Sequence, residues 1–239
     1  MTTEHCCAWN PRRNTSHETT ALRLPAVVLL VFGIAGIVSS MQQTPPAVRP
    51  PLLFREAWRL PTHTGPATDE NMRFTPEVVT NEWLEVKLYG AGSAPVRAAE
   101  HEGRIDLWTG LATSPVALTL RDKRNYLDLT GLARLRWIVR TNAIHTLYPV
   151  VKLADGMLAV GSRGISTNGE FVQVEIAFSG MKWYTLDQQK VVVMLEVKNP
   201  DLSKVDEVGV ASLAPGGGHG VAGSANFSTL ELFAKTVPR

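Results

Sequence analysis

Apolar and polar residues alternate with a period of two along several stretches of the chain. In residues 84–89, leucine and valine alternate with glutamate, lysine and tyrosine. Similar alternation runs through residues 134–140, 172–178 and 230–233. Successive side chains of a strand point to opposite faces, so each stretch predicts a β-strand with one buried face.

Shorter apolar runs bounded by Gly, Pro, Asn or Asp predict further strands. These runs cover residues 117–121, 126–129, 147–153, 191–197 and 205–212. No window of a dozen residues shows an apolar period of 3.6 with capping residues, so the pattern favours strands over helices. Many short strands separated by turn signals are typical of sandwiches and barrels. We therefore predict an all-β chain that folds as an antiparallel β-sandwich, most specifically a jelly roll.

The N-terminal part of the chain has the pattern of a secretory signal. Residues 1–23 are polar and carry three arginines, residues 24–38 are apolar and uncharged, and Ser39 and Ser40 follow. Basic, apolar and small-residue regions in this order predict a signal peptide over residues 1–40. The protein is then exported to the periplasm, the cell envelope or the medium. The apolar run is shorter than the roughly 20 residues that span a bilayer. An uncleaved signal anchor is the alternative, and only then would the protein have a membrane as its partner.

Composition and charge narrow the classes of partner. The Pro-rich residues 41–51 predict an extended linker, which leaves residues 52–239 as one sandwich domain, large enough to bury a sizeable core. The net charge of +2 gives no basic excess to hold a phosphate backbone, so we expect no nucleic-acid partner. Both cysteines, Cys6 and Cys7, precede the apolar run, so the predicted domain has no disulfide and no thiolate nucleophile.

Motifs of several enzyme classes are missing from the sequence. No Gly-x-Ser-x-Gly elbow of serine hydrolases occurs, and no second histidine follows His101-Glu102 at the spacing of a zinc protease. Acidic pairs such as Glu82 and Glu85 are close in sequence but match no strand motif of jelly-roll glucanases. We therefore assign no catalytic residue.

A glycine-rich segment, Gly216–Gly220, surrounds His219. Backbone amides in such a segment can form an anion-binding nest, whereas the alternative is a long turn between the last two strands. Binding residues concentrate at loop tips, so His219 is a candidate ligand-binding residue under either interpretation.

Arginines on one predicted strand suggest a binding face. Arg136 and Arg140 alternate with the apolar residues of 134–140, and Tyr148 and Lys152 alternate with those of 147–153. If the two strands form a hairpin, these four side chains share one outer surface. Arginine forks can hold vicinal hydroxyls or uronate carboxylates, and an aromatic ring can stack on a sugar. A solvated outer sheet face is the alternative.

Two further residues join this predicted carbohydrate site. His145 lies in the turn between the two strands, and Trp108 lies beside polar residues, where its ring could form a platform. A tryptophan buried in the core is the alternative for Trp108.

Parts of the sequence resemble a known family of jelly rolls. The stretches Asn199–Val210, Thr229–Ala234 and Leu127–Trp137 are similar to galactose-binding-like domains of family 11 carbohydrate-binding modules and complex I intermediate-associated proteins. The resemblance extends loosely over the whole predicted domain, and its motifs are structural rather than catalytic. It implies a sandwich, carbohydrate as the ligand class and, as an option, a structural calcium ion. It transfers no ligand-binding residue, and fold-level analogy is a weak basis for function.

The leading hypothesis from the sequence is an exported, non-catalytic carbohydrate-binding module. One alternative is a polysaccharide lyase or glycoside hydrolase on a jelly-roll scaffold, although the Gln-Ile-His and Tyr-Phe-Lys strand signatures of jelly-roll alginate lyases are missing. The other alternative is a protein–protein interaction module of the cell envelope.

Overall fold

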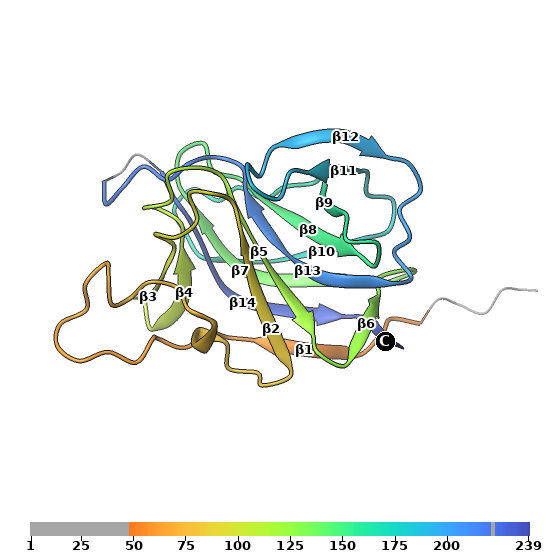
Figure 1. Ribbon diagram of the computed structural model, residues 1–239, viewed down its shortest axis with the longest axis horizontal. Helices are drawn as coiled ribbons and strands as arrows, with labels where there is room; N and C mark the ends of the chain where they lie inside the picture. Colours follow the sequence, from red (N-terminus) through yellow and green to blue (C-terminus); the bar gives the residue numbers. More distant parts are fainter. Residues whose placement is uncertain (1–47, 221–222) are drawn as a thin grey trace, which may run out of the picture. The chain divides into compact units, whose positions relative to one another are not determined.

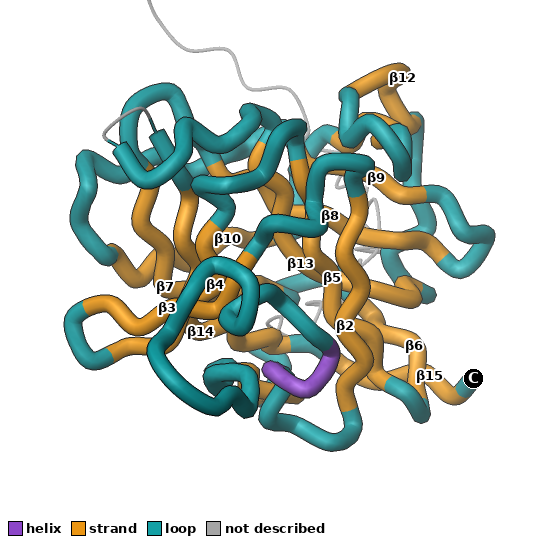
Figure 2. The backbone as a smooth tube through the Cα atoms, turned by 60° about the vertical axis from the view of Figure 1, so that its left-hand side comes forward, coloured by secondary structure: helices purple, strands orange, loops and turns teal. Residues whose placement is uncertain are grey.

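The computed structural model describes residues 48–220 and 223–239. The predicted signal segment 1–40 and residues 41–47 of the predicted linker lie outside these residues. Within them, the only helical element is a single 3-10 turn, η1 (Pro76–Val78), drawn in purple in Figure 2. No helix of the described residues is both long and apolar enough to cross a membrane.

The first layer is a six-stranded antiparallel sheet. Its strands follow the order β10-β7-β14-β4-β3, and β1 also pairs with β14. The six strands are β1 (Leu52–Glu56), β3 (Arg97–His101), β4 (Arg104–Trp108), β7 (Arg134–Thr141), β10 (Val172–Ala177) and β14 (Ala225–Phe233).

The second layer is a nine-stranded antiparallel sheet. Its main path is β12-β11-β9-β8-β13-β5-β2, while β6 pairs with both β13 and β15. The nine strands are β2 (Leu84–Tyr89), β5 (Val116–Asp122), β6 (Asn125–Asp128), β8 (Leu147–Leu153), β9 (Leu158–Gly161), β11 (Trp183–Leu186), β12 (Val193–Val197), β13 (Val205–Ser212) and β15 (Lys235–Pro238).

The chain passes repeatedly from one sheet to the other, as Figure 1 shows. It crosses between β7 and β8, between β9 and β10, and again between β10 and β11 and between β13 and β14. This alternation is the winding of a jelly roll. The predicted all-β, antiparallel sandwich is thus confirmed.

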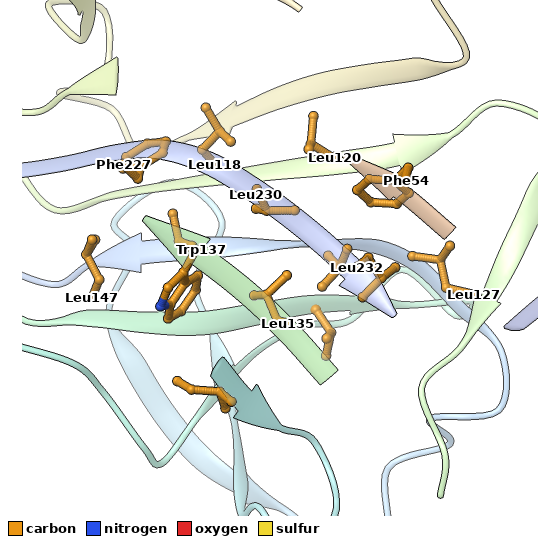
Figure 3. Packing of buried hydrophobic residues seen from close by; sticks show 14 of the residues in the cluster. Phe54, Leu118, Leu120, Leu127, Leu135, Trp137, Leu147, Phe227, Leu230 and Leu232 are labelled. Carbon is orange, nitrogen blue, oxygen red and sulfur yellow. The ribbon is translucent and has the colours of Figure 1, made fainter. Parts of the chain in front are cut away.

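The core fills the space between the sheets. Trp137 and Leu230 of the six-stranded sheet and Leu118 and Leu147 of the nine-stranded sheet are at most 2% exposed. Figure 3 shows such side chains from both sheets pointing toward one another. Full burial of one aliphatic or aromatic side chain of this size contributes about 1.5–3 kcal/mol, so these alternating apolar positions hold the two layers together.

The predicted hairpin of residues 134–140 and 147–153 is wrong. β7 is flanked by β10 and β14 in the six-stranded sheet, whereas β8 is flanked by β13 and β9 in the other. Both edges of each strand are therefore occupied. The short connection between β7 and β8 runs from one sheet to the other. A turn-rich segment can make this crossing as readily as it can form a hairpin.

This correction divides the predicted binding face. Arg136 and Arg140 point away from the core on the six-stranded sheet, while Tyr148 and Lys152 point away from it on the nine-stranded sheet. The four residues do not share a surface.

Candidate ligand-binding site

The outer face of the six-stranded sheet gathers four of the sequence-predicted site residues. Arg136 and Arg140 lie on β7, Trp108 lies on β4, and His219 reaches the same face from the glycine-rich loop. Asn226 of β14 is the register partner of both Trp108 and Arg140. Trp108 and Arg140 are therefore two strands apart, which corresponds to about 10 Å.

The arginines of β7 are held by a network of ion pairs. Arg136 contacts Glu231 through Nη1 at 3.2 Å and Glu175 through Nη2 at 3.2 Å. Glu175 also pairs with Arg134, at 3.0 Å. The guanidinium groups of Arg134 and Arg136 lie 4.5 and 4.7 Å from the ring centroid of Phe233. A guanidinium that is fixed on two carboxylates and an aromatic ring loses little freedom when it binds a ligand.

A shallow cavity of about 110 Å³ opens beside Arg136. A bulge in β14 shapes it, because Ser228 and Thr229 together oppose the single residue Ile138 of β7. The cavity is lined by Arg55, Arg136, Trp137, Ile138, Gln173, Thr229 and Glu231. Its polar members offer guanidinium, amide, hydroxyl and carboxylate groups, which together can donate and accept hydrogen bonds.

A second polar chain runs beneath the same face toward β3. His101 Nδ1 lies 2.7 Å from Asp106 Oδ2, and Asn226 Nδ2 donates to Asp106 Oδ1 at 2.7 Å. Arg140 Nε donates to Asn226 Oδ1 at 3.4 Å. Asp106 and Asn226 are fully buried. These contacts fix the orientation of the His101 imidazole. The ring can then hold or move a proton at its other nitrogen, Nε2.

Sequence reasoning missed the His101–Asp106 pair. The two residues flank the turn at Glu102 and Gly103, where both backbones have positive φ. Counting outward from this turn places His101 and Asp106 on the same face of a hairpin. Glu-Gly directly before the alternating residues 104–108 was the signal that could have revealed them.

Trp108 and His219 form a cluster at the other end of β4. Their ring centroids are 5.3 Å apart, and the Arg97 guanidinium lies 4.5 Å from the Trp108 centroid. Asp69 forms an ion pair with Arg97, and its Oδ2 lies 2.6 Å from His219 Nε2. The hydrogen bond with His219, together with the charge of Arg97, lowers the pKa of Asp69. Trp108 is only 7% exposed, so its ring is not an open platform for a sugar.

The glycine-rich loop uses its amides within the fold. The amides of Gly216 and Gly218 donate to the carbonyls of Ala112 and Gly110, each at 2.7 Å, and that of Gly217 donates to Gly223 at 2.9 Å. These three N–H groups are therefore not free to form an anion nest, so the turn interpretation describes the loop.

The remaining predicted site residues lie away from this face. His145 is 1% exposed, and its Nδ1 lies 3.0 Å from Ser212 Oγ. Burial lowers its pKa. Lys152 lies 3.4 Å from the buried Glu207, and Tyr148 packs into a small apolar cluster of the nine-stranded sheet. His145 therefore lies in the connection between β7 and β8, as expected, but it is buried there and not exposed at a loop tip.

No group of three or more His, Cys, Asp or Glu side chains that could hold a metal ion occurs in residues 48–220 and 223–239. The calcium ion implied by the sequence resemblance stays a prediction, because calcium also binds backbone carbonyls and waters.

Comparison with known proteins found no matching family model and no matching curated protein. Among solved structures, the chain is similar to the family 11 carbohydrate-binding module of a cellulosomal cellulase of Clostridium thermocellum. Identity is 14% over 65% of this chain and 85% of that one, with a TM-score of 0.38. It is also similar to the family 11 module of that organism in complex with a mixed-linked β-1,3-1,4 tetrasaccharide, at 13% identity over 64% and 85% of the two chains and a TM-score of 0.37.

A third similar structure is arcelin-5, a lectin-like defence protein of Phaseolus vulgaris. Identity is 8% over 66% of this chain and 95% of that one, with a TM-score of 0.37. The similarity to family 11 modules expected from the sequence is thus found among solved structures. Structural similarity at such TM-scores does not indicate the ligand or the activity of this protein. A functional proposal therefore rests on the geometry of the site.

Proposed function

We propose that this protein is an exported, non-catalytic module that binds a carbohydrate on the outer face of its six-stranded sheet. The observation that supports this proposal is the cavity beside Arg136. It combines two arginines with glutamine, threonine and glutamate side chains on a rigid sheet. Sugars present both donors and acceptors around a ring, and this mixed lining can satisfy both.

Arg136 is the central residue of the proposed site. Its side chain is 32% exposed, so part of the guanidinium remains accessible although Glu175 and Glu231 hold it. Hydrogen bonds to a charged group are worth about 1.5–3 kcal/mol. Loss of one such bond lowers affinity by about tenfold to a hundredfold.

The proposal is tested by affinity electrophoresis of the protein in native gels that contain different plant and microbial polysaccharides. We expect retardation by at least one polymer, with the polymer chain length unchanged afterwards. Arg136→Lys keeps the positive charge beside both glutamates but removes the planar fork. We expect this variant to lose most of the retardation while its melting temperature stays close to that of the parent.

Arg163 supplies the matched control. Its guanidinium donates to the carbonyls of Ser179 and Gly180, away from the proposed site. Arg163→Lys should leave retardation unchanged. Equal retardation of the parent and both variants would exclude the cavity beside Arg136 as the binding site.

The His101–Asp106 pair favours a second candidate, a polysaccharide lyase or hydrolase. A carboxylate on Nδ1 orients the imidazole, so that Nε2 can accept a proton from a substrate or a water molecule. New reducing ends or unsaturated products, released by the parent but not by His101→Asn, would support this candidate. An intact polymer across the whole panel would exclude it and leave the binding function.

A further inference from the structure

The segment between β1 and η1, residues 57–75, is long and contains no helix or strand. Figure 1 shows it in orange beside β3. Near its end, Phe74 donates to the carbonyl of Val96, and Ala98 of β3 donates to the carbonyl of Met72. Loops longer than about 12–15 residues without secondary structure are usually either functional or disordered. Because backbone hydrogen bonds hold this segment against β3, its length indicates a function.

Side chains also brace this segment. The amide of Thr68 donates to Asn71 Oδ1 at 2.7 Å, and Asn71 Nδ2 donates to the carbonyl of Pro66 at 2.8 Å. Asp69 forms an ion pair with Arg97 of β3. A wall that is fixed before a ligand arrives loses little freedom when the ligand binds.

A cavity of about 340 Å³ is lined jointly by this segment and by β3. Its volume lies at the lower end of the range of about 300–1,000 Å³ that is usual for small-molecule sites. The apolar members of its lining are Leu60, Ala67, Met72, Ala98 and Ala99, and the polar members are His63, Arg97, Glu100 and His101. A largely apolar wall with a few polar groups is the usual composition of a site for a small ligand.

Two nitrogen atoms of this lining are buried and have no hydrogen-bond partner within residues 48–220 and 223–239. They are Nδ1 of His63 and Nε of Arg97. Buried polar atoms in folded proteins are normally paired, because an unpaired one loses its hydration without compensation. His101 adds a third nitrogen, Nε2, since its Nδ1 already lies against Asp106. The cavity therefore presents polar nitrogens that a ligand can satisfy.

A carboxylate is the ligand group that suits these nitrogens. Arg97 Nε can only donate, and an ionised carboxylate offers two accepting oxygens and forms the stronger, charge-assisted hydrogen bonds. Asp69, which balances the charge of Arg97, also contacts His219 at 2.6 Å. Glu100 is the one carboxylate among the lining residues described, and it is exposed.

We propose that this cavity binds a small organic acid. The carboxylate is held by Arg97 and His63, and the apolar part of the ligand lies against Leu60 and Met72. The cavity shares no lining residue with the one beside Arg136. The acid site is therefore separate from the proposed carbohydrate site and does not depend on it.

Ligand-observed NMR titration of the full chain tests the proposal. The probes are butyrate, benzoate and phenylacetate, each compared with its uncharged amide. We expect at least one acid to bind saturably and about tenfold more tightly than its amide, because the amide offers no charged acceptor. His63→Phe removes Nδ1 but keeps a flat ring, and Ala67→Phe fills the cavity from an exposed position. Either variant should raise the dissociation constant of the acid by about tenfold or more.

Thr64→Phe is the matched control for Ala67→Phe, because Thr64 is exposed on the same segment but is not part of the lining. It should leave the dissociation constant unchanged, and both variants should keep the melting temperature of the parent. Arg136→Lys should also leave acid binding unchanged, which separates this site from the carbohydrate site. The proposal is overturned when no acid of the panel binds, when an amide binds as tightly as its acid, or when Ala67→Phe and Thr64→Phe have the same effect.

Discussion

Tyr89 offers a sharp test of the buried polar cluster on the nine-stranded sheet. Its hydroxyl donates to Glu207 Oε2 at 2.7 Å, and Lys152 Nζ lies 3.1 Å from the same hydroxyl. Glu207 is fully buried, and its other oxygen lies 3.2 Å from Lys87 Nζ. Burial, followed by the neighbouring Glu207, raises the pKa of Tyr89, so the hydroxyl stays a donor throughout the ordinary pH range.

Tyr89→Phe removes this donor without changing the shape of the ring. A hydrogen bond to a charged group contributes about 1.5–3 kcal/mol, and a buried carboxylate oxygen cannot replace it easily with bulk water. For a domain of this size, each kcal/mol shifts the melting temperature by about 2–4 °C. We therefore expect a decrease of about 3–12 °C, measured by differential scanning calorimetry, with a matching decrease in the urea midpoint.

Tyr126→Phe is the matched control. Its ring lies beneath the Arg239 guanidinium, at 4.4 Å, and its hydroxyl makes no hydrogen bond to another side chain in the part of the chain described. We expect a shift of less than about 0.5 kcal/mol, as is usual for surface changes. Equal shifts in the two variants would refute the assignment of Tyr89 as a stabilising partner of the buried carboxylate.

Two further predictions concern His145 and Gly209. Burial lowers the pKa of His145 from 6.5, so its neutral form contributes stability that is complete above pH 6.5 and is lost as the pH falls below it toward the folded-state value. His145→Asn should flatten the decline of melting temperature between about pH 6.5 and 5; parallel declines in both proteins would contradict this. Gly209→Ala places a Cβ 1.9 Å from the Leu118 carbonyl oxygen of the adjacent strand. Because backbone cannot yield easily, we expect a loss of about 1–3 kcal/mol or more in urea unfolding, whereas Gly220→Ala, with nothing within 4 Å, should be neutral.

Alternation predicted which side chains enter the core. Leu135, Trp137 and Val139 are all buried, as the period of two requires. The alternation could not predict which strands are neighbours, because strands pair through backbone hydrogen bonds that do not depend on the type of side chain. Arg140 and Tyr148 were therefore assigned to one surface although they lie on different sheets.

Buried polar residues were the other part of the site that the pattern could not reveal. Asp106 and Asn226 occupy outward positions of their strands and look like solvated residues in the sequence. Both are nevertheless fully buried: Asn226 donates to Asp106 and accepts from Arg140, and Asp106 lies within hydrogen-bond distance of His101. Such burial depends on contacts between β4 and β14, which are distant in the sequence.

The alternation along β7 separates positions that face the core from positions that line the cavity of the proposed binding site. Leu135 and Trp137 face the core, while Ile138 faces the cavity beside Arg136, together with Gln173 and Thr229. Substitutions at the latter three positions change the cavity without removing a buried contact of the main core. A library randomised there could therefore be selected for new ligands, with the sandwich serving as a constant scaffold for engineered affinity reagents.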